Sequence, residues 1–131
     1  MEAFIGTWKL VQDVNYDSYL RATGAGEEMI AITNVLKPVV TISQDDSIVV
    51  ITRKSGLGTE EVSFTLGREF KREEKDGRYC KVTVELEENQ LVQVEKWDNE
   101  EAIAVCEVKD GKLIKTITFQ GITAMRTFEK V

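Results

Sequence analysis

Short runs in which apolar and polar side chains alternate recur along most of this chain. The segment 122–131, ITAMRTFEKV, is one such run, and the segment 112–119, KLIKTITF, is another. Successive side chains of a strand point to opposite faces, so this pattern is typical of strands with one buried face. Asp-Gly pairs at 76–77 and 110–111 separate such runs and favour tight hairpins. We count ten candidate strands with short links, which predicts an all-β antiparallel sandwich or barrel.

The segment 15–38 departs from this alternation. Its apolar residues recur at helical spacing in two groups, which predicts two short helices separated at Gly24–Gly26. Asn15 is a suitable N-cap for the first helix, and Pro38 is expected to stop the second. A barrel of ten strands is too wide to be filled by its own side chains, so it encloses a cavity. The helix pair is expected to cover the open end of that cavity.

The composition excludes several classes of function. The chain has no histidine, which removes the usual base of a catalytic triad and the commonest metal ligand. Its net charge of −6 disfavours a nucleic-acid partner. Cys80 and Cys106 are too few for a disulfide framework, so we expect two free thiols in a reducing, cytoplasmic compartment. We also expect no metal and no cofactor.

The length and the absence of special segments predict a simple organisation. The 131 residues suit one domain, 1–131, with a core that needs no metal or disulfide. No apolar run is long enough to cross a membrane, and the N-terminus MEAFIGTWKL lacks the pattern of a secretory signal.

Several stretches carry a resemblance to a known family. FIGTWKL at 4–10, followed by NYD at 15–17, resembles the opening signature of the intracellular lipid-binding proteins. The stretches that follow in register are KPVVTI, EVSFTLGREF, DGRYCKVTV, LVQVEKWD and GITAMRTF. The chain is most similar to the heart, adipocyte and myelin type of fatty-acid-binding protein. The resemblance implies a ten-stranded antiparallel β-clam of two orthogonal five-stranded sheets, with a helix–turn–helix lid between the first two strands.

The same resemblance implies a function and its partners. Members of the family bind a fatty acid or another small lipid in an internal cavity, without a cofactor and without covalent chemistry. We therefore expect a cytoplasmic monomer that is not an enzyme and makes at most transient contact with membranes.

Arg126 is the unexpected residue of the last alternating run. It shares a face with Ile122, Ala124 and Phe128, so its side chain is expected to point into the interior. A buried guanidinium is costly unless a carboxylate pairs with it, and the resemblance assigns Arg126 to the carboxylate of the ligand. The tyrosine that accompanies it in many relatives is Phe128 here, and a second interior arginine is Cys106. The alternative is a register slip of one residue, which would expose Arg126.

Lys115, Glu95 and Arg72 are the other charged candidates. Lys115 interrupts an apolar face, so it could supply a second cation near Cys106, although a lysine near a strand end can also reach solvent. Glu95 and Arg72 fall at positions that face the cavity in relatives. They are either solvated charges at the rim or an internal pair. Glu95 could also pair with Arg126 or Lys115, which would favour a less acidic ligand.

The resemblance also assigns a larger set of residues to the cavity and its portal. These residues are Tyr16, Leu20, Ala25, Met29, Thr33, Val40, Arg53, Leu57, Asp76, Arg78, Gln93 and Ile117. Leu57 stands where many relatives carry a phenylalanine, so the portal is expected to be wider. Glu27 and Glu28 stand where relatives often carry basic residues, which weakens both collisional transfer to anionic membranes and nuclear import as mechanisms.

Four functions remain in competition. The first is a carrier of long-chain fatty acids, and the second is a carrier of a retinoid or other less acidic lipid whose head group contacts Arg126, Gln93 and Glu95. The third is an enzyme in which Lys115 and Glu95 act as nucleophile and base on a carbonyl lipid. The fourth is a membrane-stacking protein like the myelin relative, which the acidic composition disfavours.

Overall fold

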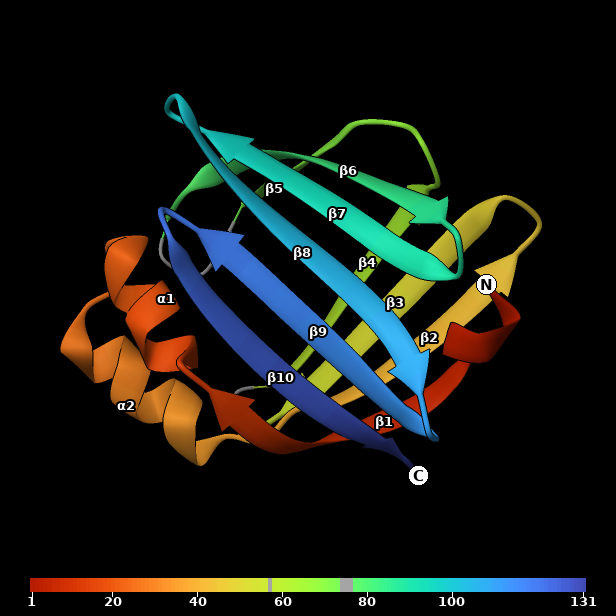
Figure 1. Ribbon diagram of the computed structural model, residues 1–131, viewed down its shortest axis with the longest axis horizontal. Helices are drawn as coiled ribbons and strands as arrows, with labels where there is room; N and C mark the ends of the chain where they lie inside the picture. The colour runs from red at the N-terminus through yellow and green to blue at the C-terminus, as the bar shows by residue number, and fades with distance from the viewer. Residues whose placement is uncertain (57, 74–76) are drawn as a thin grey trace.

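The computed structural model describes residues 1–56, 58–73 and 77–131. Its strands form one antiparallel sheet of ten in the order β4-β3-β2-β1-β10-β9-β8-β7-β6-β5, so β4 and β5 are its two edges. The sheet folds over into two layers, with β7, β8 and β9 in front of β2, β3 and β4 (Figure 1). The predicted ten-stranded clam is therefore confirmed. The strands are β1 (Gly6–Val14), β2 (Val39–Asp45), β3 (Ile48–Ser55), β4 (Gly58–Thr65), β5 (Phe70–Glu73), β6 (Tyr79–Glu87), β7 (Gln90–Trp97), β8 (Glu100–Lys109), β9 (Lys112–Phe119) and β10 (Ile122–Lys130).

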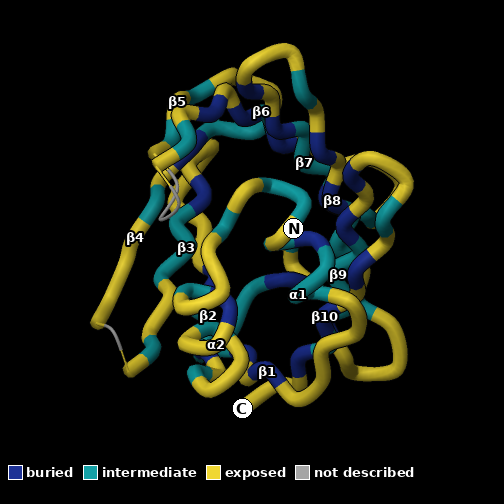
Figure 2. The backbone as a smooth tube through the Cα atoms, turned by 90° about the vertical axis from the view of Figure 1, so that its left-hand side faces the viewer, coloured by how far each residue is buried: buried dark blue, intermediate teal, exposed yellow. Residues whose placement is uncertain are grey.

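Two helices, α1 (Tyr16–Ala22) and α2 (Glu27–Val35), lie between β1 and β2, as predicted. They lie together at one end of the clam, and a view from that end shows them in front of the strands (Figures 1 and 2). Asn15 does occupy the N-cap position of α1, but its side chain makes no capping hydrogen bond. Its backbone is left-handed, with φ 58°, and its Nδ2 donates to the carbonyl oxygen of Thr123 at 3.4 Å. The expected side-chain cap is therefore wrong. Within the described residues, no helix is long and apolar enough to cross a membrane.

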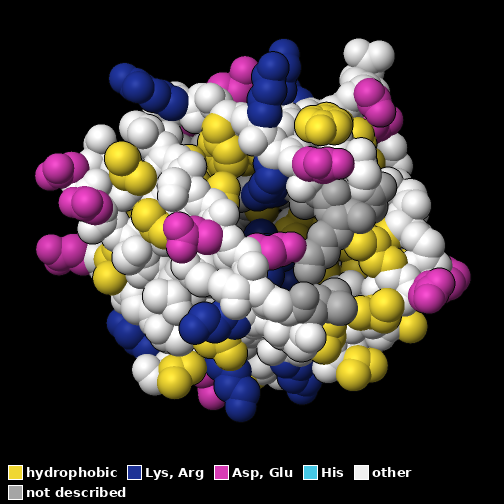
Figure 3. Space-filling view, turned by 180° about the vertical axis from the view of Figure 1, so that it is seen from behind, with side chains coloured by type: hydrophobic (Ala, Val, Ile, Leu, Met, Phe, Trp, Pro, Cys, Tyr) yellow, Lys and Arg dark blue, Asp and Glu magenta, His cyan; other side chains and the backbone are white. Residues whose placement is uncertain are grey.

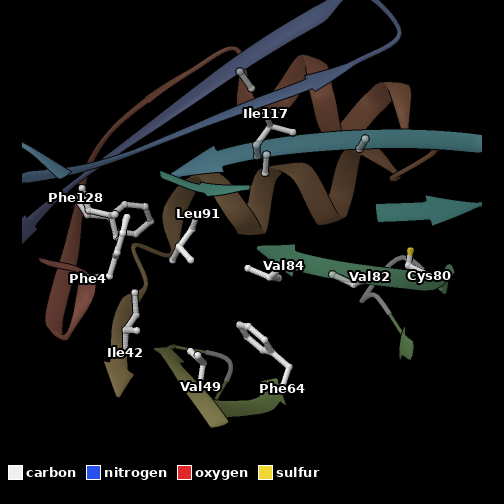
Figure 4. Close-up of a cluster of buried hydrophobic side chains, with 14 of the residues drawn as sticks. Phe4, Ile42, Val49, Phe64, Cys80, Val82, Val84, Leu91, Ile117 and Phe128 are labelled. Carbon is white, nitrogen blue, oxygen red and sulfur yellow. The ribbon is translucent and has the colours of Figure 1, made fainter. Parts of the chain in front are cut away.

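The apolar core comes mostly from the strands, and Tyr19 of α1 belongs to it. A short 3-10 helix, η1 (Glu2–Phe4), carries Phe4 into it, where Phe4 lies beside Phe128 (Figure 4). Trp8 on β1 is 1% exposed, and its Nε1 donates to the carbonyl oxygen of Phe4 at 2.9 Å. Ile42, Leu91 and other buried residues complete this cluster.

Strand β10 shows the alternation that the sequence predicts. Ala124, Arg126 and Phe128 are buried, whereas Met125 is 41% exposed. Arg126 therefore does point inward, and the alternative of a one-residue register slip is wrong.

Strand β1 does not keep a single alternation along its length. Trp8 and Leu10 face the core, but the pairing of β1 with β10 shifts between Leu10 and Gln12. A bulge adds one residue to one strand of a pair and so reverses the faces beyond it. After the shift, Asp13 stands directly opposite Arg126.

Candidate functional site

A cavity of about 550 Å³ lies under the two helices. Seen from behind, the surface of the molecule has a hollow near its middle (Figure 3). Lys or Arg side chains lie inside this hollow, and Asp or Glu side chains lie at its rim. The wall combines residues of both helices, the link after α2, and strands β3, β5, β7, β8, β9 and β10. The volume is within the usual range for a site that holds a small organic ligand.

Most of the expected site residues line this cavity. Those in the wall are Tyr16, Leu20, Met29, Thr33, Arg53, Arg72, Arg78, Gln93, Glu95, Lys115, Ile117 and Arg126. Leu57 and Asp76 lie outside the described residues. The wall also includes residues that we did not assign to it, namely Tyr19, Gly26, Glu28, Ile32, Leu36, Pro38, Ser55, Ala102 and Ala104. Ala102 and Ala104 were detectable, because two inward small residues on one strand leave space beside them.

Four expected residues stand outside this described wall. Ala25 lies in the link between α1 and α2, and Val40 packs against the core cluster. Phe128 belongs to the core and is 5% exposed. Cys106 is half-buried on β8, directly opposite Lys115. The assignment of Ala25 and Val40 to the cavity and portal, and of Cys106 and Phe128 to the ligand carboxylate, therefore stays a prediction.

Four polar side chains stand in one row across β8, β9, β10 and β1. Cys106 is paired with Lys115, Lys115 with Arg126, and Arg126 with Asp13, each as directly opposite residues of neighbouring strands. Directly opposite residues lie on the same face of a sheet, within reach of one another. The sheet therefore places Lys115 between a thiol and a guanidinium.

Arg126 has a carboxylate partner within the protein. Its Nε donates to Oδ1 of Asp13 at 2.8 Å, and its Nη2 lies 3.5 Å from Oδ2. The side chains of Arg126 and Asp13 are 7% and 26% exposed. The Arg126 Cζ also lies 3.9 Å from the centre of the Tyr16 ring, which is within cation–π distance. We expected a ligand carboxylate to offset the cost of burying the Arg126 guanidinium. Asp13 does so instead, because the β1 bulge turns Asp13 to the inner face of the sheet.

Glu95 and Arg72 form a second internal pair. Arg72 Nη2 lies 2.6 Å from Glu95 Oε1, and the Glu95 side chain is only 5% exposed. The interpretation of these residues as an internal pair is therefore confirmed. The pairing of Glu95 with Arg126 or Lys115 stays a prediction, since the salt bridge seen for Glu95 is with Arg72.

Lys115 points into the cavity and does not extend to the outer surface. Burial lowers the pKa of its amine, and the guanidinium groups of Arg53, Arg72 and Arg126 lower it further, while Cys106 opposes them. Among the described residues, no carboxylate lies within ion-pair distance of Lys115. Burial also raises the pKa of the Cys106 thiol, against the opposing effect of Lys115. The thiol is therefore a protonated neighbour of the amine.

Tyr19 and Arg78 form the other polar group of the wall. Burial and the charge of Glu95 raise the pKa of Tyr19, whose side chain is hydrogen-bonded to Arg78. The Cζ of Arg78 lies 4.3 Å from the centre of the Trp97 ring. Tyr19 therefore presents a neutral hydroxyl at the cavity.

The wall as a whole is cationic, although the protein is acidic. It contains the cations Arg53, Arg72, Arg78, Lys115 and Arg126, but only Glu28 and Glu95 as acids. The net charge of the whole chain is −6. An apolar space with buried cations attracts a ligand that has a hydrocarbon body and an acidic head group. In the described parts of the chain, no group of three His, Cys, Asp or Glu side chains could hold a metal ion.

Comparison with known proteins places this architecture in a family. Residues 5–131 match the model of the lipocalin / cytosolic fatty-acid binding protein family. The REP1-NXSQ fatty acid transporter is 30% identical, with 100% of this chain and 98% of that chain covered and a TM-score of 0.94. The fluorescent protein UnaG is 36% identical, with 99% and 98% covered and a TM-score of 0.94. A Schistosoma mansoni fatty acid binding protein, solved with arachidonic acid, is 28% identical, with 100% and 98% covered and a TM-score of 0.94. The chain belongs to the lipocalin / cytosolic fatty-acid binding protein family.

Proposed function

We propose that this protein binds a long-chain fatty acid or a similar acidic lipid inside its cavity and carries it, as a monomer, through the cytoplasm. The observation that carries the proposal is the excess of cations over acids in the wall of a cavity of about 550 Å³. An acidic head group is drawn to those cations, and each methylene of the chain that leaves water contributes about 0.8 kcal/mol. Binding needs no covalent step and no cofactor.

The names of the relatives support this proposal. One similar structure is described as a fatty acid transporter, and another holds arachidonic acid. Both cover the whole of this chain, so the comparison concerns the entire clam and not one motif.

The test compares ligands that differ only in the head group. The protein is freed of lipid, and binding of a long-chain fatty acid, the matching alcohol and the matching methyl ester is measured by calorimetry. We expect the acid to bind roughly tenfold tighter than the alcohol or more, since charge-assisted hydrogen bonds are the stronger kind. Equal affinity for the three lipids, or no binding, would refute the proposal of an acidic ligand.

A less acidic ligand is the second candidate, and two ion pairs favour it. Asp13 and Glu95 already form ion pairs with Arg126 and Arg72, so these two cations of the wall do not need a negatively charged ligand. A retinoid or similar lipid would then be bound mainly through its apolar body. Tighter binding of the alcohol than of the acid would support this candidate.

A further inference from the structure

The residue expected to hold the head group of a ligand is already engaged. Arg126 uses Nε and Nη2 toward the carboxylate of Asp13, and one face of its guanidinium lies against the ring of Tyr16. Phe128, two positions along β10, has no hydroxyl and lies in the core. A ligand carboxylate that reached Arg126 would find its Nε–Nη2 edge taken and its charge already offset by Asp13, which lies 2.8 Å away.

The position of Asp13 is a property of the backbone. Strands β1 and β10 pair from Trp8 and Lys130 at one end to Val14 and Met125 at the other, with one shift between Leu10 and Gln12. That shift places Asp13 directly opposite Arg126. A carboxylate in a fixed strand has little conformational entropy left to lose on pairing, whereas a ligand must lose its own freedom to take the same place.

Lys115 stands beside this pair and, within residues 1–56, 58–73 and 77–131, has no such carboxylate partner. It is directly opposite Arg126 on one side and Cys106 on the other, and it lines the cavity. Its charged neighbours are the guanidinium groups of Arg53, Arg72 and Arg126, and among the described residues no carboxylate approaches it within ion-pair distance. Every charge that faces it from β3, β5 and β10 thus has the same sign as its own ammonium form.

We propose that Asp13 is a built-in counter-ion that keeps Arg126 away from the ligand, and that the acidic head group is bound at Lys115. This inference rests on the proposed function, because it assigns the head-group site of the same cavity. Asp13 and Arg126 are positioning residues in this arrangement, and Lys115 is the group that contacts the head group.

Proton transfer makes the arrangement workable. Burial and the neighbouring guanidinium groups lower the pKa of Lys115, so the empty cavity disfavours its ammonium form more than water does. A carboxylic acid that enters can transfer its proton to this amine, so that a carboxylate–ammonium pair forms without a net change of charge in the cavity. The same transfer is not available to an alcohol or an ester, so Lys115 discriminates between head groups.

The test measures the affinity for a fatty acid and for the matching alcohol in three variants. Lys115→Met is expected to weaken binding of the acid roughly tenfold or more, while binding of the alcohol changes little. Arg126→Met is expected to weaken binding of the acid far less. Asp13→Asn is expected to tighten binding of the acid, because it releases a guanidinium toward the ligand.

The outcomes separate this inference from the proposed function. If the parent protein does not prefer the acid to the alcohol, the proposed function fails. If it does, and Arg126→Met removes the preference while Lys115→Met keeps it, the assignment to Lys115 is overturned. If Asp13→Asn weakens binding of the acid, the role of Asp13 as a competing counter-ion is overturned.

A measurement on the parent protein covers the case in which a variant does not fold. A fatty acid labelled with ¹³C at its first methylene carbons is bound, and the nuclear Overhauser contacts of their protons are recorded. Contacts from the first methylenes of the ligand to the Lys115 side chain are expected. Contacts to the Arg126 side chain, without any to Lys115, would overturn the inference.

Discussion

Arg72 and Glu95 form an ion pair between two strands that are not neighbours, with Nη2 of Arg72 2.6 Å from Oε1 of Glu95. Glu95 is nearly buried, whereas 29% of the Arg72 side chain is exposed. Removing one partner of a buried pair leaves the other charge uncompensated. We therefore expect Arg72→Met to lower the free energy of unfolding by about 2 kcal/mol, less than for a fully buried pair.

A double-mutant cycle in urea isolates this coupling. The loss in free energy of unfolding in the double variant Arg72→Met, Glu95→Gln should be smaller than the sum of the losses in the two single variants, by about 1–3 kcal/mol. The matched control is the pair Arg53–Glu60, whose atoms are 4.0 Å apart and whose side chains are 44% and 51% exposed. That control should show a coupling of about 0–1 kcal/mol. Additive changes at Arg72 and Glu95 would contradict the prediction.

Replacing Lys115 by methionine should stabilise the protein without ligand at neutral pH. The amine is buried and its pKa is lowered, so between the folded-state pKa and the usual value of about 10.4 the unfolded chain binds a proton that the folded chain does not. Because of Lys115, the free energy of unfolding of the parent protein rises with pH between the folded-state pKa of this residue and about 10.4. The advantage of Lys115→Met should therefore shrink as pH approaches about 10.

Denaturation in urea at several pH values measures this effect. Lys96→Met on the outer surface is a suitable control, because Lys96 is exposed. The control should show no comparable dependence on pH. A loss of stability in Lys115→Met at pH 7 would mean that the amine has an ion partner in the folded protein.

Tyr19 should make the protein sensitive to alkaline pH. Its ring packs against Tyr16, with centroids 5.8 Å apart, and meets Phe119 edge-on at 6.2 Å. Burial raises the pKa of Tyr19, so above about pH 10 the folded chain keeps a proton that the unfolded chain loses. Stability therefore falls as the pH rises above that value.

Substitution by phenylalanine separates this effect from general alkaline unfolding. Tyr19→Phe should reduce the fall in stability between pH 9 and about pH 11, whereas Tyr79→Phe should not, because Tyr79 is 72% exposed. Equal slopes for the parent protein and Tyr19→Phe would contradict the prediction. Absorbance of phenolate in the folded protein gives an independent readout, since Tyr19 should ionise only on unfolding.

Alternation in the sequence was sufficient to predict the strands and the inward face of Arg126. Strands β6 and β10 each have a buried face with period two, and in β10 this period is unbroken from Ala124 to Phe128. The two helices were equally predictable, because segment 15–38 is the one place where the period changes. Lys115 also follows the rule, since it lies between the buried residues Leu113 and Ile117 on β9.

The carboxylate partner of Arg126 could not be predicted, and the Arg72–Glu95 pair was only one of two alternatives, for two physical reasons. Asp13 lies on the inner face only because of the shift in β1, and no glycine or proline between Leu10 and Asp13 signals it. Arg72 and Glu95 lie on β5 and β7, with β6 between them, so their contact depends on the curvature of the sheet. Neither a local irregularity nor curvature leaves a periodic signal in the sequence.

The acidic start of α2 should limit the transfer of lipid to anionic membranes. Glu27 accepts from Nε of Arg21 at 2.8 Å, whereas Glu28 lines the cavity, and Ile32 and Val35 on the same helix are 40% and 79% exposed. The apolar surface of α2 could contact a bilayer, but the acids oppose its approach. Glu28→Lys is expected to raise the rate of transfer of a fluorescent fatty acid to anionic vesicles roughly tenfold, because it changes the local charge by two units.

The dependence on salt and on lipid composition shows whether this effect is electrostatic. The gain should fade as the ionic strength rises above about 0.15 M, where the screening length is about 8 Å. It should be absent with zwitterionic vesicles, which attract neither form of the protein. Glu28→Gln is the matched control and should give about half of the logarithmic gain, since it removes one charge and adds none. An equal gain with both vesicle types would mean that Glu28 acts by closing the cavity and not by repelling the membrane.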